Sequence, residues 1–249
     1  MSIFFHEQLY RTHAVMALLK DYPVTICGAG ALGANLTENL ARAGFGNLKV
    51  IDRDRIEERN LSTQPYYRSD IGAFKAKILA NNLYRAIGTK VEAETKELTA
   101  ANAAQLLKDS QLIVDVFDNS TSRQAVKDYA ERSGVPCLHA GLSADYAEII
   151  WNEVYRVPTH VNDDICDYPL ARNLVMLLTW HGKRGQGFWS SRDVVRSCCV
   201  IYKSPALSFI AALITVAVAC EAIVSFIATG DRHNFTITLK DLTVRSLRL

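Results

Sequence analysis

The sequence contains no Cys-x-x-Cys pair, although it has six cysteines among its 249 residues. They are Cys27, Cys137, Cys166, Cys198, Cys199 and Cys220. Without that spacing, neither a zinc knuckle nor a thioredoxin-like redox site is indicated. Free thiols are typical of proteins in a reducing compartment, so we expect the protein to be cytoplasmic.

An excess of charge of one sign is also absent. The 28 lysines and arginines are balanced by 26 acidic residues, which gives a formal net charge of +2. A protein that coats nucleic acid through phosphate contacts needs a larger basic excess, so no nucleic-acid partner is expected. The first residues, MSIFFHEQLYR, lack the basic segment and long apolar run of a secretory signal, and none is expected. The 49% of hydrophobic residues exclude a disordered or collagen-like chain.

One apolar run, from Ala206 to Ala228, is long enough to cross a bilayer as a helix. Glu221 interrupts it, and the run is rich in alanine, which favours close packing on other protein elements. We therefore expect a buried helix and no membrane partner.

Strand and helix patterns alternate over the first 142 residues. The apolar run Pro23 to Cys27 precedes a glycine turn and a helical pattern from Ala34 to Ala43, and Leu48 to Ile51 supplies a second strand. Such a unit is joined by a right-handed crossover between parallel strands. Further helices are predicted at Phe74–Ala86, Ala100–Leu107 and Arg123–Arg132, and further strands at Val91–Thr95, Leu112–Phe117, Pro136–His139 and Ala147–Val157.

The chain ends in NFTITLK and LTVRSLRL, which predict a hairpin about Lys240 and Asp241. The expected fold class is α/β, a Rossmann-like doubly wound sheet, mainly parallel with antiparallel C-terminal strands. We expect one domain over residues 1–249, with a nucleotide-binding half at 1–142 and a substrate and dimerisation half at 143–249.

A GxGxxG motif lies between the first strand and its helix. Its glycines are Gly28, Gly30 and Gly33, and they let backbone amides and the helix N-terminus approach phosphates. Asp52 follows about twenty residues later, where a carboxylate accepts hydrogen bonds from ribose hydroxyls. The pattern predicts nucleotide binding without naming the nucleotide, because an NAD-dependent dehydrogenase shows the same two features.

Several later motifs decide between these nucleotides. The segments are DRD at 52–54, NLSTQ at 60–64, GAFKA at 72–76, DVFDNSTSR at 115–123 and CEAI at 220–223. In order and spacing they resemble the ThiF, MoeB and HesA family, the bacterial relatives of ubiquitin-activating enzymes. The match covers residues 24–142 and continues more weakly through the apolar helix.

The resemblance implies ATP-dependent adenylation of a carboxylate, commonly the C-terminus of a ubiquitin-like or sulfur-carrier protein. Its implied nucleotide site comprises Gly28, Gly30, Gly33, Asp52, Asp54, Asn60, Gln64, Lys75, Asn119 and Arg123, with Asp118 as the ligand of an ATP-bound Mg²⁺. Lys75 and Asp118 would be catalytic, since phosphoryl chemistry needs charge neutralisation. The structural alternatives are an exposed helix lysine for Lys75, a helix N-cap for Asp118 and a turn residue for Asn60.

Two departures from the family pattern bear on activity. Thr63 stands where the family has an arginine, although Arg59 or Arg68 would supply a cation nearby. A non-catalytic module that holds a nucleotide and recruits a ubiquitin-like partner is therefore a second hypothesis. The zinc-binding Cys-x-x-Cys pairs common in the family are missing, so no structural zinc is expected.

The resemblance also implies a homodimer in which Arg11 reaches the neighbouring subunit's ATP. The alternative is an ordinary surface arginine. Cys198 and Cys199 occupy the place of the family's acyl-accepting cysteine, with Cys199 preferred and Cys166 as the next candidate. The alternative for these thiols is an inert, half-buried role. Further hypotheses are adenylation of a small-molecule, peptide or RNA-linked carboxylate, and an NAD oxidoreductase. His139 is a lone histidine without metal spacing and receives no role.

Overall fold

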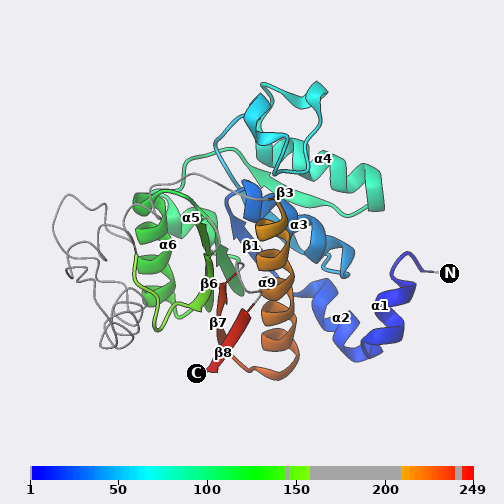
Figure 1. Ribbon diagram of the computed structural model, residues 1–249, viewed down its shortest axis with the longest axis vertical. Helices are drawn as coiled ribbons and strands as arrows, with labels where there is room; N and C mark the ends of the chain where they lie inside the picture. Colours follow the sequence, from blue (N-terminus) through cyan, green and yellow to red (C-terminus); the bar gives the residue numbers. More distant parts are fainter. Residues whose placement is uncertain (1, 144–145, 158–208, 239–242) are drawn as a thin grey trace, which may run out of the picture.

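The computed structural model describes residues 2–143, 146–157, 209–238 and 243–249 (Figure 1). Within these residues the strands form an eight-stranded sheet in the order β3-β2-β1-β4-β5-β6-β7-β8. They are β1 Val24–Cys27, β2 Leu48–Ile51, β3 Val91–Glu94, β4 Leu112–Asp115, β5 Cys137–Ser143, β6 Tyr146–Trp151, β7 His233–Thr238 and β8 Thr243–Arg248. Neighbours from β3 to β5 pair in parallel, and those from β5 to β8 pair antiparallel. The expected fold class is confirmed, including its antiparallel C-terminal strands.

Helices cover both faces of the sheet. One face carries α2 His13–Asp21, α3 Ala31–Arg42, α4 Lys75–Ile87 and α9 Phe209–Thr229, and the other carries α5 Ala103–Leu107 and α6 Ser120–Ser133. The short helix α1 Phe5–Tyr10 packs on α2, and two 3-10 turns, η1 Glu58–Asn60 and η2 Arg68–Asp70, lie between β2 and α4. Alternate residues of each central strand face the two helical layers, which explains why these strands are mostly apolar.

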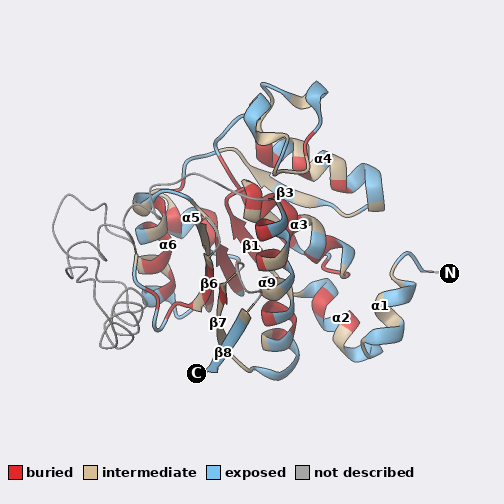
Figure 2. Ribbon diagram, in the orientation of Figure 1, coloured by how far each residue is buried: buried red, intermediate tan, exposed pale blue. Residues whose placement is uncertain are grey.

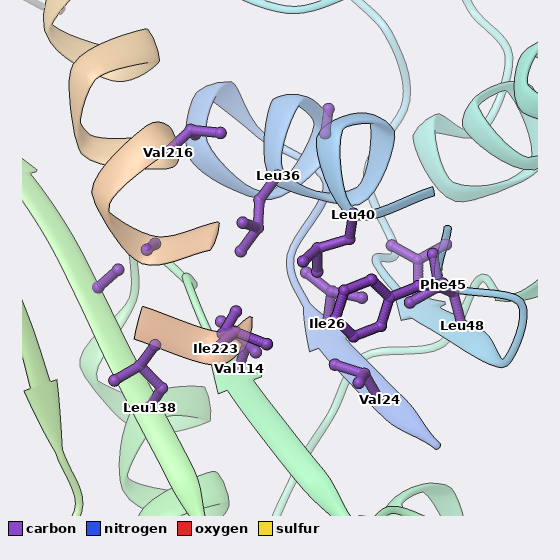
Figure 3. Packing of buried hydrophobic residues seen from close by; sticks show 14 of the residues in the cluster. Val24, Ile26, Leu36, Leu40, Phe45, Leu48, Val114, Leu138, Val216 and Ile223 are labelled. Atoms are coloured by element: carbon purple, nitrogen blue, oxygen red, sulfur yellow. The ribbon is translucent and has the colours of Figure 1, made fainter. Parts of the chain in front are cut away.

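The larger core lies between the sheet and the helices α3 and α9. In Figure 3, Leu36 and Leu40 point from α3 toward the sheet, with Leu40 beside Ile26 of β1, while Ile223 of α9 lies beside Val114 of β4. Phe45, just after α3, is fully buried beside them. This packing holds the N-terminal end of α3 against the end of β1, where the glycine turn lies.

Helix α9 has the length and composition of a membrane-spanning segment over Ile210–Thr229, with a mean hydropathy of 2.4. In the structure one face is buried on α3 and the sheet, and Figure 2 shows the exposed residues on its other side. Buried packing is therefore confirmed for one face. Ile210 and Leu213 remain exposed on the other.

The start of α6 and the end of β4, both near the expected site, differ from the positions predicted from the apolar pattern. Helix α6 begins at Ser120 rather than Arg123, because the side chain of Asn119 accepts the Ser122 amide and caps it. Strand β4 ends at Asp115 rather than Phe117, where the Asp115 carboxylate accepts the Phe117 amide and turns the chain.

Candidate nucleotide site

The site lies where the order of the parallel strands reverses, between β1 and β4. After β1 the chain crosses to β2 on one side, and after β4 it crosses to β5 on the other, so α3 and α6 leave opposite faces at adjacent strand ends. The last residues of the two strands, Cys27 and Asp115, are paired. Ligands of doubly wound folds bind at such a topological switch point, at the carboxyl ends of the strands.

Two glycines of the predicted motif are required by the packing of the chain on itself. Gly28 has φ +115°, a conformation that favours glycine. A Cβ on Gly33 would lie 2.0 Å from the Gly28 carbonyl oxygen and 2.8 Å from a methyl of Val116. Gly28 and Gly33 therefore allow α3 to begin directly against the ends of β1 and β4.

Gly30 differs from the other two glycines. It is the N-cap residue of α3, and a Cβ built there would meet no heavy atom within 4 Å. The protein's own packing does not require glycine at this position. A ligand phosphate at the N-terminus of α3 gives a reason for it, because such a helix end offers unpaired amides and a positive dipole.

Three further residues of the predicted nucleotide site lie together beside the glycine turn. They are Asp52, Asp54 and Lys75. Asp52 is buried, and its two carboxylate oxygens accept the amides of Ala29 at 2.6 Å and Asp54 at 2.7 Å. Burial raises the pKa of the Asp52 carboxyl, against the lowering effect of these two hydrogen bonds and of the Lys75 charge. Asp52 thereby connects the glycine turn to the segment after β2.

Lys75 is the first residue of α4, and only 7% of its surface is exposed. Its Nζ donates to Asp54 Oδ2 at 3.1 Å, and its amide donates to the Asp54 carbonyl at 3.0 Å. The alternative that Lys75 is an exposed helix lysine is therefore wrong. A buried ammonium with one carboxylate partner is well suited to receive a polyphosphate.

Asn60 and Gln64 lie in the turn between β2 and α4. Asn60 Oδ1 accepts the Glu57 amide at 2.9 Å and caps η1, which is the turn role considered above. Gln64 Oε1 is buried and has no hydrogen-bond partner among the described residues. A buried acceptor of this kind needs a donor from a ligand or water. A phosphate oxygen cannot supply one, so the part of Gln64 suited to phosphate is its amide nitrogen.

The positions that bear on the missing family arginine are also in this turn. The Thr63 carbonyl accepts Asn35 Nδ2 of α3 at 3.0 Å, which holds the turn against α3. Arg59 and Arg68 are highly exposed and pair with Glu57 and Glu58. Each therefore has an acidic neighbour from which it would have to move to reach a ligand.

Asp118 is exposed and lies on the loop from β4 to α6. Asn119 rather than Asp118 caps α6, so the alternative N-cap role of Asp118 is wrong. Arg123 donates to the Phe117 carbonyl at 2.5 Å and to the Ala140 carbonyl at 2.9 Å, and its role toward a nucleotide stays a prediction.

No cluster of three or more histidine, cysteine or acidic side chains that would hold a metal occurs in the part of the chain that the structure describes. One exposed carboxylate, Asp118, nevertheless fits a Mg²⁺ that takes most of its ligands from phosphates and water. The donor set suits a metal that arrives with a nucleotide.

Arg11 pairs within its own chain. Its guanidinium donates to Glu7 at 3.0 Å and to Glu221 of α9 at 2.9 Å. The single chain does not test a contact with a neighbouring subunit, and that contact stays a prediction.

The proposed acyl acceptors Cys198 and Cys199, with Cys166, lie outside the described residues. Among the described cysteines, Cys27 and Cys137 are fully buried, and burial raises the pKa of both thiols. Raised pKa and lack of access make these two poor nucleophiles.

Sequence reasoning missed the partners of His139. The ring is buried between β4 and the segment after β6, with Nδ1 2.8 Å from Asp115 Oδ2. A polar residue inside an otherwise apolar strand was the available signal, because buried polar groups are hydrogen-bonded.

The strand order, the glycine turn and the carboxylates at the switch point define a Rossmann-type α/β protein. The chain belongs to the ThiF family, whose sequence model matches residues 8–247. The sulfur carrier protein ThiS adenylyltransferase of Bacillus subtilis is 36% identical over 132 residues, covering 51% of this chain and 39% of that protein. The sulfur carrier protein adenylyltransferase of Thermus thermophilus is 34% identical over 149 residues, covering 55% of each. The chain therefore spans less than two thirds of the length of these relatives.

Solved structures share the fold. Escherichia coli MccB with ATP has a TM-score of 0.71 at 19% identity and covers 100% of this chain and 71% of that one. PaaA has a TM-score of 0.63 at 20% identity, with 94% of this chain and 66% of that one covered.

Proposed function

We propose that the protein is an ATP-dependent adenylyltransferase that activates the C-terminal carboxylate of a ubiquitin-like or sulfur-carrier protein. The observation that carries the proposal is the convergence of the Lys75–Asp54 pair, buried Asp52 and the open Gly30 position around the N-terminus of α3. The adenylyltransferases of sulfur carrier proteins among its relatives support the choice of reaction.

In the proposed reaction a carboxylate oxygen attacks the α-phosphate of ATP. The bond between the α-phosphorus and the bridging oxygen breaks, and the products are an acyl adenylate and pyrophosphate. Negative charge grows on the leaving pyrophosphate, so a fixed cation beside it lowers the barrier. Bound Mg²⁺ would supply further charge neutralisation.

The residues of the chain have separate tasks in this scheme. Asp52 would accept the ribose hydroxyls, while the first amides of α3 and the Gln64 amide would donate to phosphate oxygens. Lys75 would leave Asp54 for the phosphates. Asp118 would hold Mg²⁺ from the opposite side of the switch point.

The partner assignments belong to the same proposal. We place the nucleotide half at residues 1–142 and the substrate and dimerisation half at 143–249, in a cytoplasmic homodimer. Exposed apolar side chains support a self-association surface: they are Ile3, Leu9 and Tyr10 near α1, and Ile210 and Leu213 on α9. The Arg11–Glu221 ion pair ties the end of α1 to α9.

ATP–pyrophosphate exchange tests the proposed function. The purified chain is assayed with radiolabelled pyrophosphate and MgATP, with a small carrier protein ending in Gly-Gly, a short peptide or acetate as the carboxylate. Exchange that requires the carrier supports the proposal. Exchange with only the peptide or acetate assigns a different carboxylate. ATP binding without exchange under every condition identifies a non-catalytic module.

A further inference from the structure

The backbone amide and carbonyl of Phe117, the residue before Asp118, are each hydrogen-bonded to a buried charged side chain. The Phe117 amide donates to Asp115 Oδ1 at 3.1 Å, and the Phe117 carbonyl accepts Arg123 Nε at 2.5 Å. Asp115 is completely buried, and the side chain of Arg123 is only 11% exposed. The direction of the chain as it enters Asp118 therefore depends on where these two side chains are held.

His139 completes the support of Asp115. Its Nδ1 lies 2.8 Å from Asp115 Oδ2, the oxygen that does not bind Phe117. An ionised carboxylate only accepts, so Nδ1 carries the proton of this hydrogen bond. The Arg123 guanidinium lies farther away, 3.6 Å from the same oxygen. His139 thus orients the carboxylate with one oxygen toward the ring and the other toward Phe117.

The histidine ring is itself fixed on two sides. Its Nε2 lies 2.8 Å from Asn152 Oδ1, and its face stacks on Tyr155 with ring centroids 3.7 Å apart and planes 9° apart. The Tyr155 hydroxyl accepts Arg123 at 2.9 Å, which closes a ring of contacts from Arg123 through Asp115, His139 and Tyr155. Residues of β4, β5, α6 and the segment after β6 are all engaged.

A buried ionic network adds little net free energy to the stability of a core. Well-packed apolar residues of similar volume are often equally stable or more so, because they avoid the desolvation of charges. Apolar residues pack beside this network, with Ile113 on β4 and Val126 and Ala130 on α6. The Asp115–His139 pair lies at the end of β4 that adjoins the Asp118 loop, and this position links the pair to the site.

We propose that His139 is a positioning residue for Asp118, acting through Asp115. Without the His139 proton, the Asp115 carboxylate turns toward Arg123, its remaining charged partner, and both side chains release the Phe117 peptide. Asp118 then loses its fixed direction. The consequence for catalysis rests on the proposed function, in which Asp118 holds the ATP-bound Mg²⁺.

Two substitutions of His139 separate its two hydrogen bonds. In His139→Asn the amide nitrogen replaces Nδ1 and keeps the bond to Asp115, whereas in His139→Gln the longer side chain reaches toward Asn152 instead. Both are polar and smaller than histidine, so any loss of packing is shared. His233→Gln is the matched control, since His233 on β7 also bonds a side-chain oxygen through Nδ1, that of Ser246 at 2.9 Å.

The first measurement needs no nucleotide and no activity. Amide hydrogen exchange of Phe117 in the free protein reports directly on its bond to Asp115. We expect exchange at least tenfold faster in His139→Gln, within about twofold of wild type in His139→Asn, and unchanged in the control. Equal Phe117 protection in folded His139→Gln and wild type overturns the proposal, as does equal loss in both His139 variants.

The second measurement is a double-mutant cycle in pyrophosphate exchange. We expect His139→Gln to lower kcat about tenfold with the KM for MgATP within twofold, and to have no further effect in an Asp118→Ala background. The same fold loss in both backgrounds overturns an action through Asp118. A wild-type chain without exchange overturns the proposed function, while Phe117 protection still decides the positioning of the loop.

Discussion

Lys75 Nζ lies 3.1 Å from Asp54 Oδ2, although the two residues are 21 positions apart and come from opposite ends of the segment between β2 and α4. The isolated bridge between Arg55 and Phe74 and the Lys75 amide bond to the Asp54 carbonyl close this segment at its base. The ammonium is therefore delivered to the glycine turn by backbone pairing. Its carboxylate partner, Asp54, is half exposed, which leaves the pair open to exchange with a phosphate.

Replacing Lys75 is expected to affect chemistry more than folding. Lys75→Ala should lower pyrophosphate exchange by roughly a hundredfold or more, the scale for loss of one electrostatic contact to a transition state. Lys77→Ala is the control, because Lys77 is exposed on the same helix two residues away. Wild-type exchange in a folded Lys75→Ala protein would contradict its assignment, and equal losses in the two variants would point to a general effect of charge.

The glycines of the turn should separate folding from binding. Gly33→Ala places a Cβ 2.0 Å from the Gly28 carbonyl oxygen, so we expect destabilisation of about 3 kcal/mol or more, measured by urea unfolding. Gly30→Ala meets nothing within 4 Å and should cost about 1 kcal/mol or less as a poorer N-cap. Its expected defect is about tenfold weaker MgATP binding. Unchanged ATP affinity in Gly30→Ala would show that the phosphates lie elsewhere.

Asp115 should make the fold sensitive to acid. Burial alone raises the pKa of its carboxyl, but Arg123 and His139 outweigh burial, and the net pKa is lower than the ordinary aspartate value of about 3.9. The unfolded chain then binds more protons below that value, so stability from Asp115 is present above about pH 4 and is lost as the pH falls. The contribution to the slope is at most about 1.4 kcal/mol per pH unit.

Urea unfolding of wild type and Asp115→Asn between pH 5 and about pH 3 checks this expectation. The variant should be less stable at pH 5 and show a flatter decline on acidification. Parallel declines would mean that Asp115 does not carry the lowered pKa. Where Asp115→Asn does not fold, a carbon NMR titration of the Asp115 carboxyl in the native protein gives the same answer.

The thiol prediction concerns residues outside the described part of the chain. If Cys199 or Cys198 accepts the acyl group after adenylation, Cys198→Ser with Cys199→Ser should leave pyrophosphate exchange intact and abolish a reductant-sensitive adduct with the carrier. Non-reducing electrophoresis with MgATP and the carrier detects the adduct. An adduct that persists in the double variant would move the nucleophile to another cysteine, with Cys166 the next candidate, and its absence from wild type would remove the step.

The sequence was sufficient for the fold class and for the positions of the central strands, while the roles of the site residues stay predictions. Continuous apolar runs predicted the central strands, since strands buried on both faces need no polar alternation. The association of Asp52, Asp54 and Lys75 came with a family resemblance, and backbone pairing around Asp54 explains it.

The parts that could not be predicted depend on side chains that meet from distant segments. Asn119 and Asp118 are equally good N-cap residues by type, and only the loop geometry set by Asp115 decides between them. The sequence around His139 shows no motif, because its partners are distant. Asp115 lies 24 positions before it, and Tyr155 lies on the segment after β6. The orphan oxygen of Gln64 is likewise visible only once the turn is packed.

Calorimetric titration of the free chain with ATP and with NAD, each with and without Mg²⁺, tests the central claim most directly. The arrangement of Lys75 and Asp118 predicts that ATP with Mg²⁺ binds more tightly than NAD, and that Mg²⁺ strengthens ATP binding in wild type but not in Asp118→Ala. Tighter binding of NAD, or ATP binding indifferent to Mg²⁺, would contradict the account.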